Sequence, residues 1–358
     1  MKKFYLFLSL VAFSNVFAGV SFEGIPPATT VDEAKRYFEQ RRERVFDFWV
    51  KSELGSVLAL KENGKFGYPA VARAYKRVDL ENLNKIILNP KFKPFAKYGT
   101  NFKIIKYLCE RKGDYDFALQ FLIRLAYINE KNNALWPETK RKLINELLTA
   151  KGDKHYKRFV LGICGIHVDT ENHQLMTETS RYLTNQLLVK QAIEDGKTPD
   201  PSFDNEFSGF NYWMIDHLST FLHEFFDEYN SRPYQGYTVM ALGNLFSYAE
   251  NLKVKLAAQM VLDLLSASFA IQSNGGRRSV PYRRQPKYER EWRLYIGDGE
   301  INRYSLLVGN YPYLETMDTP YTVPYGNHFM GAAAVHSYQV PDMLMDLMIR
   351  KDHHKYFQ

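Results

Sequence analysis

A carboxylic acid, an amide and an imidazole stand side by side at Glu171, Asn172 and His173, where a helical apolar pattern begins. An amide and a protonated imidazole can donate hydrogen bonds to an oxyanion, and imidazole or carboxyl groups can transfer protons near neutral pH. The same residue types also favour the first turn of a helix, with Thr170 as the expected N-cap whose hydroxyl accepts a backbone N–H. A functional cluster and a simple helix start are both open interpretations.

Further basic and aromatic side chains gather in two later stretches. The junction Asn-Ser-Arg-Pro-Tyr, residues 230–234, supplies Arg232 and Tyr234 and follows Glu228. Arginine binds carboxylates bidentately, and tyrosine rings stack on sugar faces. The remaining candidates for ligand contact lie in residues 272–286 and in a Gly-Asn-His turn after an aromatic segment: Arg277, Arg278, Tyr282, Arg283 and His328.

The elements that must position these residues are helices. Apolar residues recur three and four positions apart, and alternating strand patterns are scarce before residue 290. The start and stop signals predict helices at about 31–50, 79–88, 100–111, 114–129, 137–151, 172–190, 211–229, 233–249, 252–271, 328–337 and 341–350. The expected fold is therefore all-α, with helices joined by short loops.

The order of the helices predicts which of their ends lie together. If neighbouring helices are antiparallel, the starts of the helices expected at 172–190 and 233–249 lie at one end of the assembly. The helices expected at 211–229 and 252–271 finish at that same end. Residues 171–173, 228–234 and 272–286 then converge, although they are far apart in sequence. Beyond residue 287 the helical period is lost, and we expect a mostly irregular aromatic segment that lines a cleft.

The first 18 residues are typical of a secretory signal peptide. Lys2 and Lys3 precede an apolar run, and Ala18 ends a stretch suited to signal-peptide cleavage. No other stretch is apolar over the length that a membrane span requires. We therefore expect the mature chain, residues 19–358, in a bacterial periplasm or outside the cell, with no integral membrane segment.

Composition indicates the class of partner. The 358-residue chain has a formal charge of +7 and is 15% aromatic, which suits an anionic polymer that cations attract and rings stack on. Export favours a glycan over nucleic acid as that polymer. Cys109 and Cys164 allow at most one disulfide, and their spacing is not that of a metal site.

The helical pairs, the Asn-His dyad at a helix start and the tyrosine in the Asn-Ser-Arg-Pro-Tyr junction resemble the α/α-toroid polysaccharide lyases, such as alginate, heparin and chondroitin lyases. The similarity is diffuse and covers roughly residues 30–350. It implies a toroid of antiparallel helix pairs that cleaves uronate-containing polymers by β-elimination. Many of these lyases continue into a β-sandwich domain, which would be missing from this chain if the family pattern holds; residues 19–358 are expected to form the toroid domain.

In these lyases an Asn, a His and a Tyr, often with an Arg, carry the reaction. By position they correspond to Asn172, His173 and Tyr234, with Arg232 or the Arg277/Arg278 pair as the basic partner. Asn172, protonated His173 and an arginine would neutralise the uronate carboxylate, each contributing about 2–4 kcal/mol by analogy with oxyanion holes. The tyrosine would act as base and acid, with nearby positive charge lowering its pKa from about 10. This scheme requires no metal or cofactor.

Two other functions remain open from the residues alone. Glu171 and Glu228 provide the two carboxyl groups that glycoside hydrolysis needs on either side of a sugar bond. Alternatively the protein binds glycan in the cell envelope without cleaving it, and the Asn-His dyad is structural.

Overall fold

The computed structural model describes residues 20–54, 67–93, 115–150, 170–231, 234–274, 277–278, 299–310 and 326–351. These residues form helices and one short antiparallel hairpin, in which β1 (Ser273–Asn274) pairs with β2 (Arg277–Arg278). The all-α class predicted from the sequence is confirmed.

The described helices fall into two halves of the chain. The first half contains α2 (Val31–Arg36), α3 (Phe38–Lys51), α4 (Gly67–Lys76), α5 (Leu80–Leu88), α6 (Tyr115–Asn132), α7 (Pro137–Lys142) and the π-helical η4 (Leu143–Leu148). The second half contains α8 (Glu171–Glu194), the 3-10 turn η5 (Pro201–Phe203), α9 (Phe210–Glu224), α10 (Tyr234–Tyr248), α11 (Leu252–Gln272), α13 (Gly299–Leu307), α14 (Gly326–Val335) and α15 (Asp342–Ile349).

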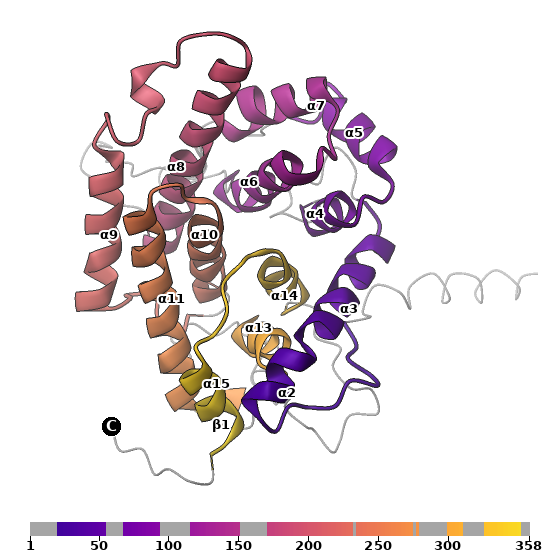
Figure 1. Ribbon diagram of the computed structural model, residues 1–358, viewed down its shortest axis with the longest axis vertical. Helices are drawn as coiled ribbons and strands as arrows, with labels where there is room; N and C mark the ends of the chain where they lie inside the picture. The colour runs from indigo at the N-terminus through magenta and orange to yellow at the C-terminus, as the bar shows by residue number, and fades with distance from the viewer. Residues whose placement is uncertain are drawn as a thin grey trace, which may run out of the picture.

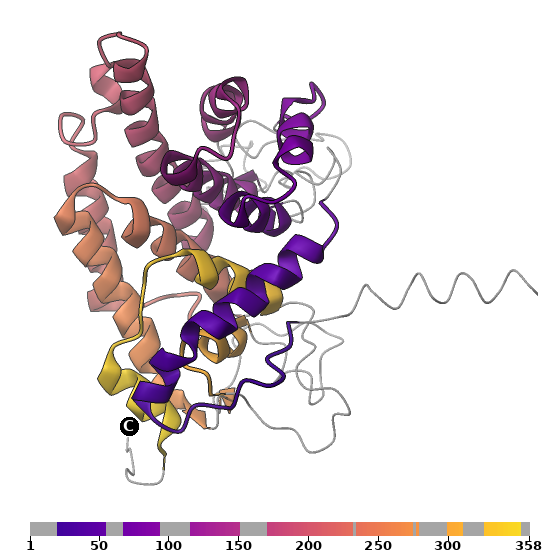
Figure 2. The same cartoon turned by 45° about the vertical axis from the view of Figure 1, so that its right-hand side comes forward.

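Five helices lie in the middle of the molecule and the others surround them. Figure 1 shows α4, α6, α10, α13 and α14 inside, with α3, α5, α7, α8, α9, α11 and α15 around them, and the turned view in Figure 2 shows α3 crossing the outside of the assembly. The sequence of α6 explains its central place, because polar as well as apolar side chains are buried from Tyr115 to Asn129. A helix that is buried on all sides must lie inside the assembly.

Contacts along neighbouring helices fix their directions. At one end Asp116 of α6 meets His173 of α8, and at the other Gln186 of α8 donates to the hydroxyl of Tyr127 of α6 at 2.7 Å. The ring of Tyr127 also stacks on Tyr248, the last residue of α10, at 4.5 Å between centroids. The helices α6, α8 and α10 therefore run in the same direction. We call the end at which they begin the rim; it comprises Asp116, residues 171–173 and 227–231, Tyr234 and Arg278.

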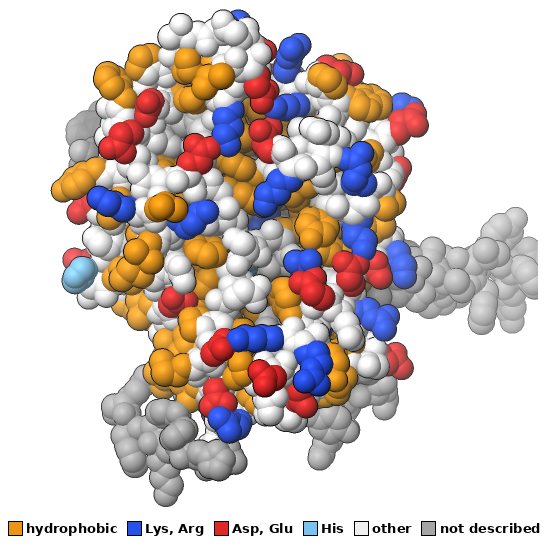
Figure 3. All heavy atoms as spheres, in the orientation of Figure 1, with side chains coloured by type: hydrophobic (Ala, Val, Ile, Leu, Met, Phe, Trp, Pro, Cys, Tyr) orange, Lys and Arg blue, Asp and Glu red, His pale blue; other side chains and the backbone are white. Residues whose placement is uncertain are grey.

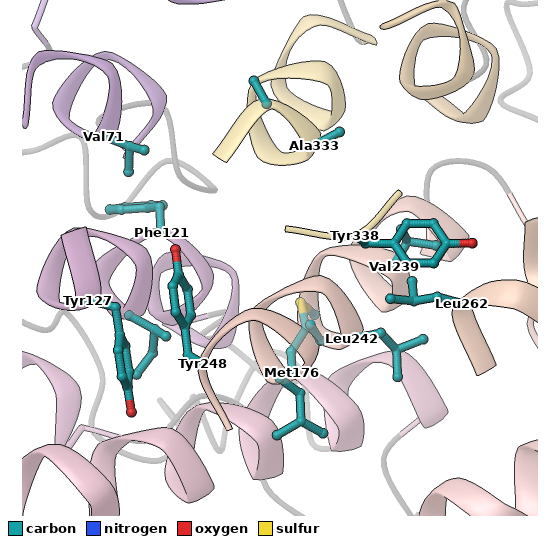
Figure 4. Close-up of a cluster of buried hydrophobic side chains, with 14 of the residues drawn as sticks. Val71, Phe121, Tyr127, Met176, Val239, Leu242, Tyr248, Leu262, Ala333 and Tyr338 are labelled. Atoms are coloured by element: carbon teal, nitrogen blue, oxygen red, sulfur yellow. The ribbon is translucent and has the colours of Figure 1, made fainter. Parts of the chain in front are cut away.

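The core is a continuous set of apolar side chains that joins the inner helices. Figure 4 shows Val71, Phe121, Met176, Leu242 and other side chains from different helices pointing toward one another. Each of these four is at most 3% exposed. Burying one such side chain stabilises the fold by about 1.5–3 kcal/mol, so the core rather than helix propensity holds the assembly together.

Several predicted boundaries differ from the structure. The helix expected at 31–50 is divided at Tyr37, and the one expected at 211–229 ends at Glu224 because Phe225 takes a left-handed φ of 63°. Residues 67–76 and 299–307 form helices that the sequence did not predict, so the segment beyond residue 287 is not irregular throughout. The signal segment, the helix expected at 100–111, both cysteines and residues 311–325 lie outside the described residues.

Among the described residues, α11 has the length and apolar composition of a membrane-crossing helix, and half of its most apolar window is buried. A core helix of a globular protein meets the same criteria. Since α11 packs against α9, α10 and α15, we describe it as part of the helical assembly.

Candidate functional site

Two carboxylates join the start of α8 to the turn between α9 and α10. The two carboxylate oxygens of Glu171 accept the backbone N–H groups of Asp227 and Glu228, at 2.9 and 2.5 Å. In return, a carboxylate oxygen of Glu228 accepts the backbone N–H of Asn172 at 3.2 Å. A carboxylate from each stretch therefore accepts backbone N–H groups of the other stretch. These reciprocal hydrogen bonds hold the start of α8 against the turn before α10.

Asn172 is fully buried, and its amide lies between these two stretches. The hydroxyl of Thr170 donates to Oδ1 of Asn172 at 2.5 Å. The prediction that the Thr170 side chain caps α8 is therefore wrong. The carboxylate of Glu228 accepts a backbone N–H in the first turn of α8 instead. Within the part of the chain that the structure describes, Nδ2 of Asn172 is buried and has no hydrogen-bond partner.

His173 pairs with a carboxylate that the sequence reasoning missed. Nδ1 of His173 lies 2.5 Å from Oδ2 of Asp116, whose side chain is fully buried, while the His173 side chain is 15% exposed. The ring of Phe117 meets the imidazole edge-on at 5.3 Å. A buried carboxylate at Nδ1 fixes the ring orientation. The signal that could have pointed to Asp116 is that it is the acidic residue in the first turn of α6, a helix that is buried on all sides.

Arg278 is tied to the rim by buried amides. Its guanidinium donates to Oδ1 of Asn230 and, at 3.2 Å, to Oε1 of Gln235, and it lies over the ring of Phe269 at 5.4 Å. Asn230 has a φ of 56°, so the turn before α10 brings its side chain onto the arginine in a conformation that few residue types adopt readily. Arg278 is only 2% exposed and is positioned as part of the rim's framework.

Tyr234 is the first residue of α10 and is half-buried. One turn later the ring of Tyr237 packs against Phe117 at 4.4 Å, and Phe117 also contacts His173. The first turn of α10 therefore lies beside the Asp116–His173 pair.

The described parts of the three stretches expected to converge share the rim, because α8 begins, α9 ends, α10 begins and α11 ends there. The last contact is between the hydroxyl of Tyr229 and the side chain of Gln272 at the end of α11. Arg232, Tyr282 and Arg283 lie outside the described residues, and only the backbone of Arg277 in β2 and of His328 in α14 is described.

The rim combines the carboxyl groups of Asp116, Glu171, Asp227 and Glu228 with the guanidinium of Arg278 and with helix N-termini. Three helices, α6, α8 and α10, point their N-termini toward it, and each carries a partial positive charge there. Burial raises the pKa of Glu171 to about 7, against the lowering effect of its two backbone N–H bonds. The face in Figure 3, by contrast, carries Lys and Arg interspersed with Asp and Glu, without a large area of one sign. No group of three or more His, Cys, Asp or Glu side chains that could hold a metal ion occurs among the described residues.

The raised pKa of Glu171 predicts a pH-dependent stability. Because the folded-state pKa of about 7 exceeds the ordinary 4.5, the folded protein binds more protons between these values, and its stability falls as pH rises through this window. We expect a loss of about 1–2 kcal/mol in unfolding free energy after allowance for solvent screening of this partly exposed group. Urea unfolding from pH 4.5 to 8 measures it.

The variant Glu171→Gln cannot titrate, so its stability should lack this component. The exposed, first-turn variant Glu138→Gln is the matched control and should keep the pH dependence of the wild type. Identical pH profiles for the wild type and Glu171→Gln would contradict the prediction.

Comparison with known protein families, characterised proteins and solved structures finds no match to this chain.

Proposed function

We propose that this protein is an exported lyase that cleaves a uronate-containing anionic polysaccharide by β-elimination at the rim. The observation that carries the proposal is the contact between Asp116 and His173 beside the buried amide of Asn172, at the point where three helices begin. An imidazolium, an amide donor and helix N-termini together suit a bound carboxylate.

The proposal includes an α/α toroid, in which inner helices run one way and outer helices the other. Arg124 of α6 contacts both Met240 of α10 and Ala332 of α14. Further along both helices, Ser247 of α10 contacts Ser337 just after α14, so α10 and α14 run in the same direction. The outer α3 runs opposite to the inner α4, since Trp49 packs on Tyr68 but the earlier Phe46 packs on Tyr75. The directions of α3, α4, α10 and α14 support a toroid, whereas α8, which lies outside α6 and α10, runs in the same direction as they do and departs from the toroid pattern.

In the proposed reaction the uronate carboxylate binds Nδ2 of Asn172 and the protonated His173. These donors withdraw charge from the sugar, so the C–H bond beside the carboxyl group becomes acidic enough to break. The ionised hydroxyl of Tyr234 takes that proton, a C=C bond forms, the bond to the leaving oxygen breaks, and the same hydroxyl returns the proton to that oxygen. Arg278, with Arg232 as an alternative, is the basic partner in this proposal.

A panel of alginate, glycosaminoglycans, pectate and peptidoglycan tests the proposal. A lyase forms unsaturated ends that absorb ultraviolet light, together with new reducing ends. New reducing ends without ultraviolet absorbance would replace the proposal with a hydrolase, and binding without any cleavage would replace it with a glycan-binding envelope protein.

Asp116→Asn is expected to lower kcat/KM by roughly tenfold or more, because a neutral partner no longer favours the protonated imidazole. NMR of the ring should show His173 titrating at a lower pH than in the wild type. Asp342→Asn, which removes an exposed carboxylate paired with Lys35, is the control and should change neither quantity. An unchanged His173 titration in Asp116→Asn would contradict this role.

A glycoside hydrolase is the second candidate, and one observation favours it. The pKa of Glu171, raised to about 7 by burial, suits a general acid, with Glu228 as the second carboxyl group. Against it, both oxygens of Glu171 and one of Glu228 already accept backbone N–H groups.

A further inference from the structure

A second cluster of charged side chains lies inside the assembly, away from the rim. Arg124 of α6 and Arg303 of α13 are each 1% exposed, and His336, just after α14, is 6% exposed. Burial, followed by the positive charges of Arg124 and Arg303, holds the pKa of His336 well below its usual value. The imidazole is therefore neutral at pH 7, and both guanidinium charges lie near it.

Carboxylates balance only part of this charge. Arg303 forms an ion pair with the buried Glu300, at 3.0 Å. Arg124 instead donates to the backbone oxygens of Ala332 and Met240, and it forms no ion pair with the described acidic residues. The described side chains of the cluster thus carry one net positive charge in the buried interior, where an unpaired charge costs several kcal/mol.

Hydrogen-bonding capacity is also left over. Nε of Arg124, Nε and Nη1 of Arg303 and Nδ1 of His336 are buried without a hydrogen-bond partner within the described part of the chain. Buried polar groups in folded proteins nearly always have a partner. Several buried nitrogens without partners, together with a net positive charge, therefore indicate that a small anion binds among these side chains.

The depth of the cluster limits the size of the ligand. Arg124 follows Asp116 by eight positions on α6, which places it about 12 Å below the rim along the helix axis. This depth along α6 separates Arg124 from a polysaccharide bound at the rim. We propose that Arg124, Arg303 and His336 bind one small monovalent inorganic anion, such as chloride, between α6, α13 and α14.

Thermal unfolding of the full mature chain in chloride tests this. Chloride replaces methanesulfonate, which is too bulky for an enclosed site, at constant ionic strength. A ligand that binds only the folded state stabilises it, so we expect Tm to rise by several degrees and to saturate. Bromide should act similarly, and a bromide-soaked crystal should show one anomalous peak per chain among the three side chains.

Two buried arginines give a matched pair of variants. Arg124→Met should lose the chloride response, whereas Arg41→Met should keep it, because Arg41 is equally buried but donates to Leu306 and Ala34 at the end of α13 and in α2. If Arg124→Met does not fold, the wild-type bromide peak decides. A Tm that does not depend on chloride, equal responses in both variants, or a bromide-free cluster in the crystal would overturn the proposal.

Discussion

Replacing Tyr234 with Phe is expected to abolish β-elimination while the fold stays intact. The substitution removes only the hydroxyl that takes the proton from the sugar and returns it to the leaving oxygen. Loss of a group with both roles lowers kcat/KM by about 10²–10⁴-fold. Tyr234 is half-buried at the helix start, so the ring can stay in place and Tm should change little. The rate of formation of unsaturated ends, with Tm alongside, measures both.

Two other tyrosines serve as controls for this prediction. Tyr212 is 77% exposed on α9, and Tyr212→Phe should leave both rate and Tm unchanged. Tyr237 packs on Phe117 one turn after Tyr234, so Tyr237→Phe tests the neighbouring hydroxyl. If Tyr237→Phe abolishes turnover and Tyr234→Phe does not, the proton transfer belongs to Tyr237. If all three variants keep full activity, a tyrosine mechanism is wrong.

Helical periodicity and chain breaks predicted the helices that carry the rim, but they missed the helix at residues 299–307. The helices α8, α10 and α11 have clear breaks before and after them, so their starts and ends were close to those observed. Residues 299–307 form a helix whose buried side chains include Glu300, Asn302 and Arg303. A pattern based on apolar spacing cannot detect such a helix, because ion pairs and amides replace apolar contacts in it.

The meeting of helix ends at the rim could be predicted because helix order determines which ends lie together. That reasoning brought Asn172 and His173 to the same end as Arg278 without any contact being known. It could not find Asp116, because the pairing of Asp116 with His173 depends on which side of α6 faces α8. Nor could it reveal that Glu171 and Glu228 cap backbone N–H groups, since neither residue has a local signal for a partner in another segment.

Removing the carboxylate of Glu300 is expected to cause a large loss of stability. Glu300 and Arg303 are both 2% exposed at the side chain, and their ion pair spans 3.0 Å. Glu300→Ala leaves a guanidinium buried without its counter-charge, which costs about 3–5 kcal/mol. Denaturant unfolding at fixed salt measures this as a lower midpoint with an unchanged slope.

Two comparisons separate this cost from the loss of side-chain volume. Glu81→Ala removes an acid from an exposed i,i+4 pair with Lys85 and should cost at most about 0.5 kcal/mol. The double variant Glu300→Leu/Arg303→Met removes both buried charges and should recover much of the stability lost in Glu300→Ala, because the unpaired charge rather than the missing attraction is what destabilises. A double variant less stable than Glu300→Ala would instead mean that Arg303 stabilises the core through Tyr304, whose hydroxyl accepts a bond from it and donates to Ser266 at 3.0 Å.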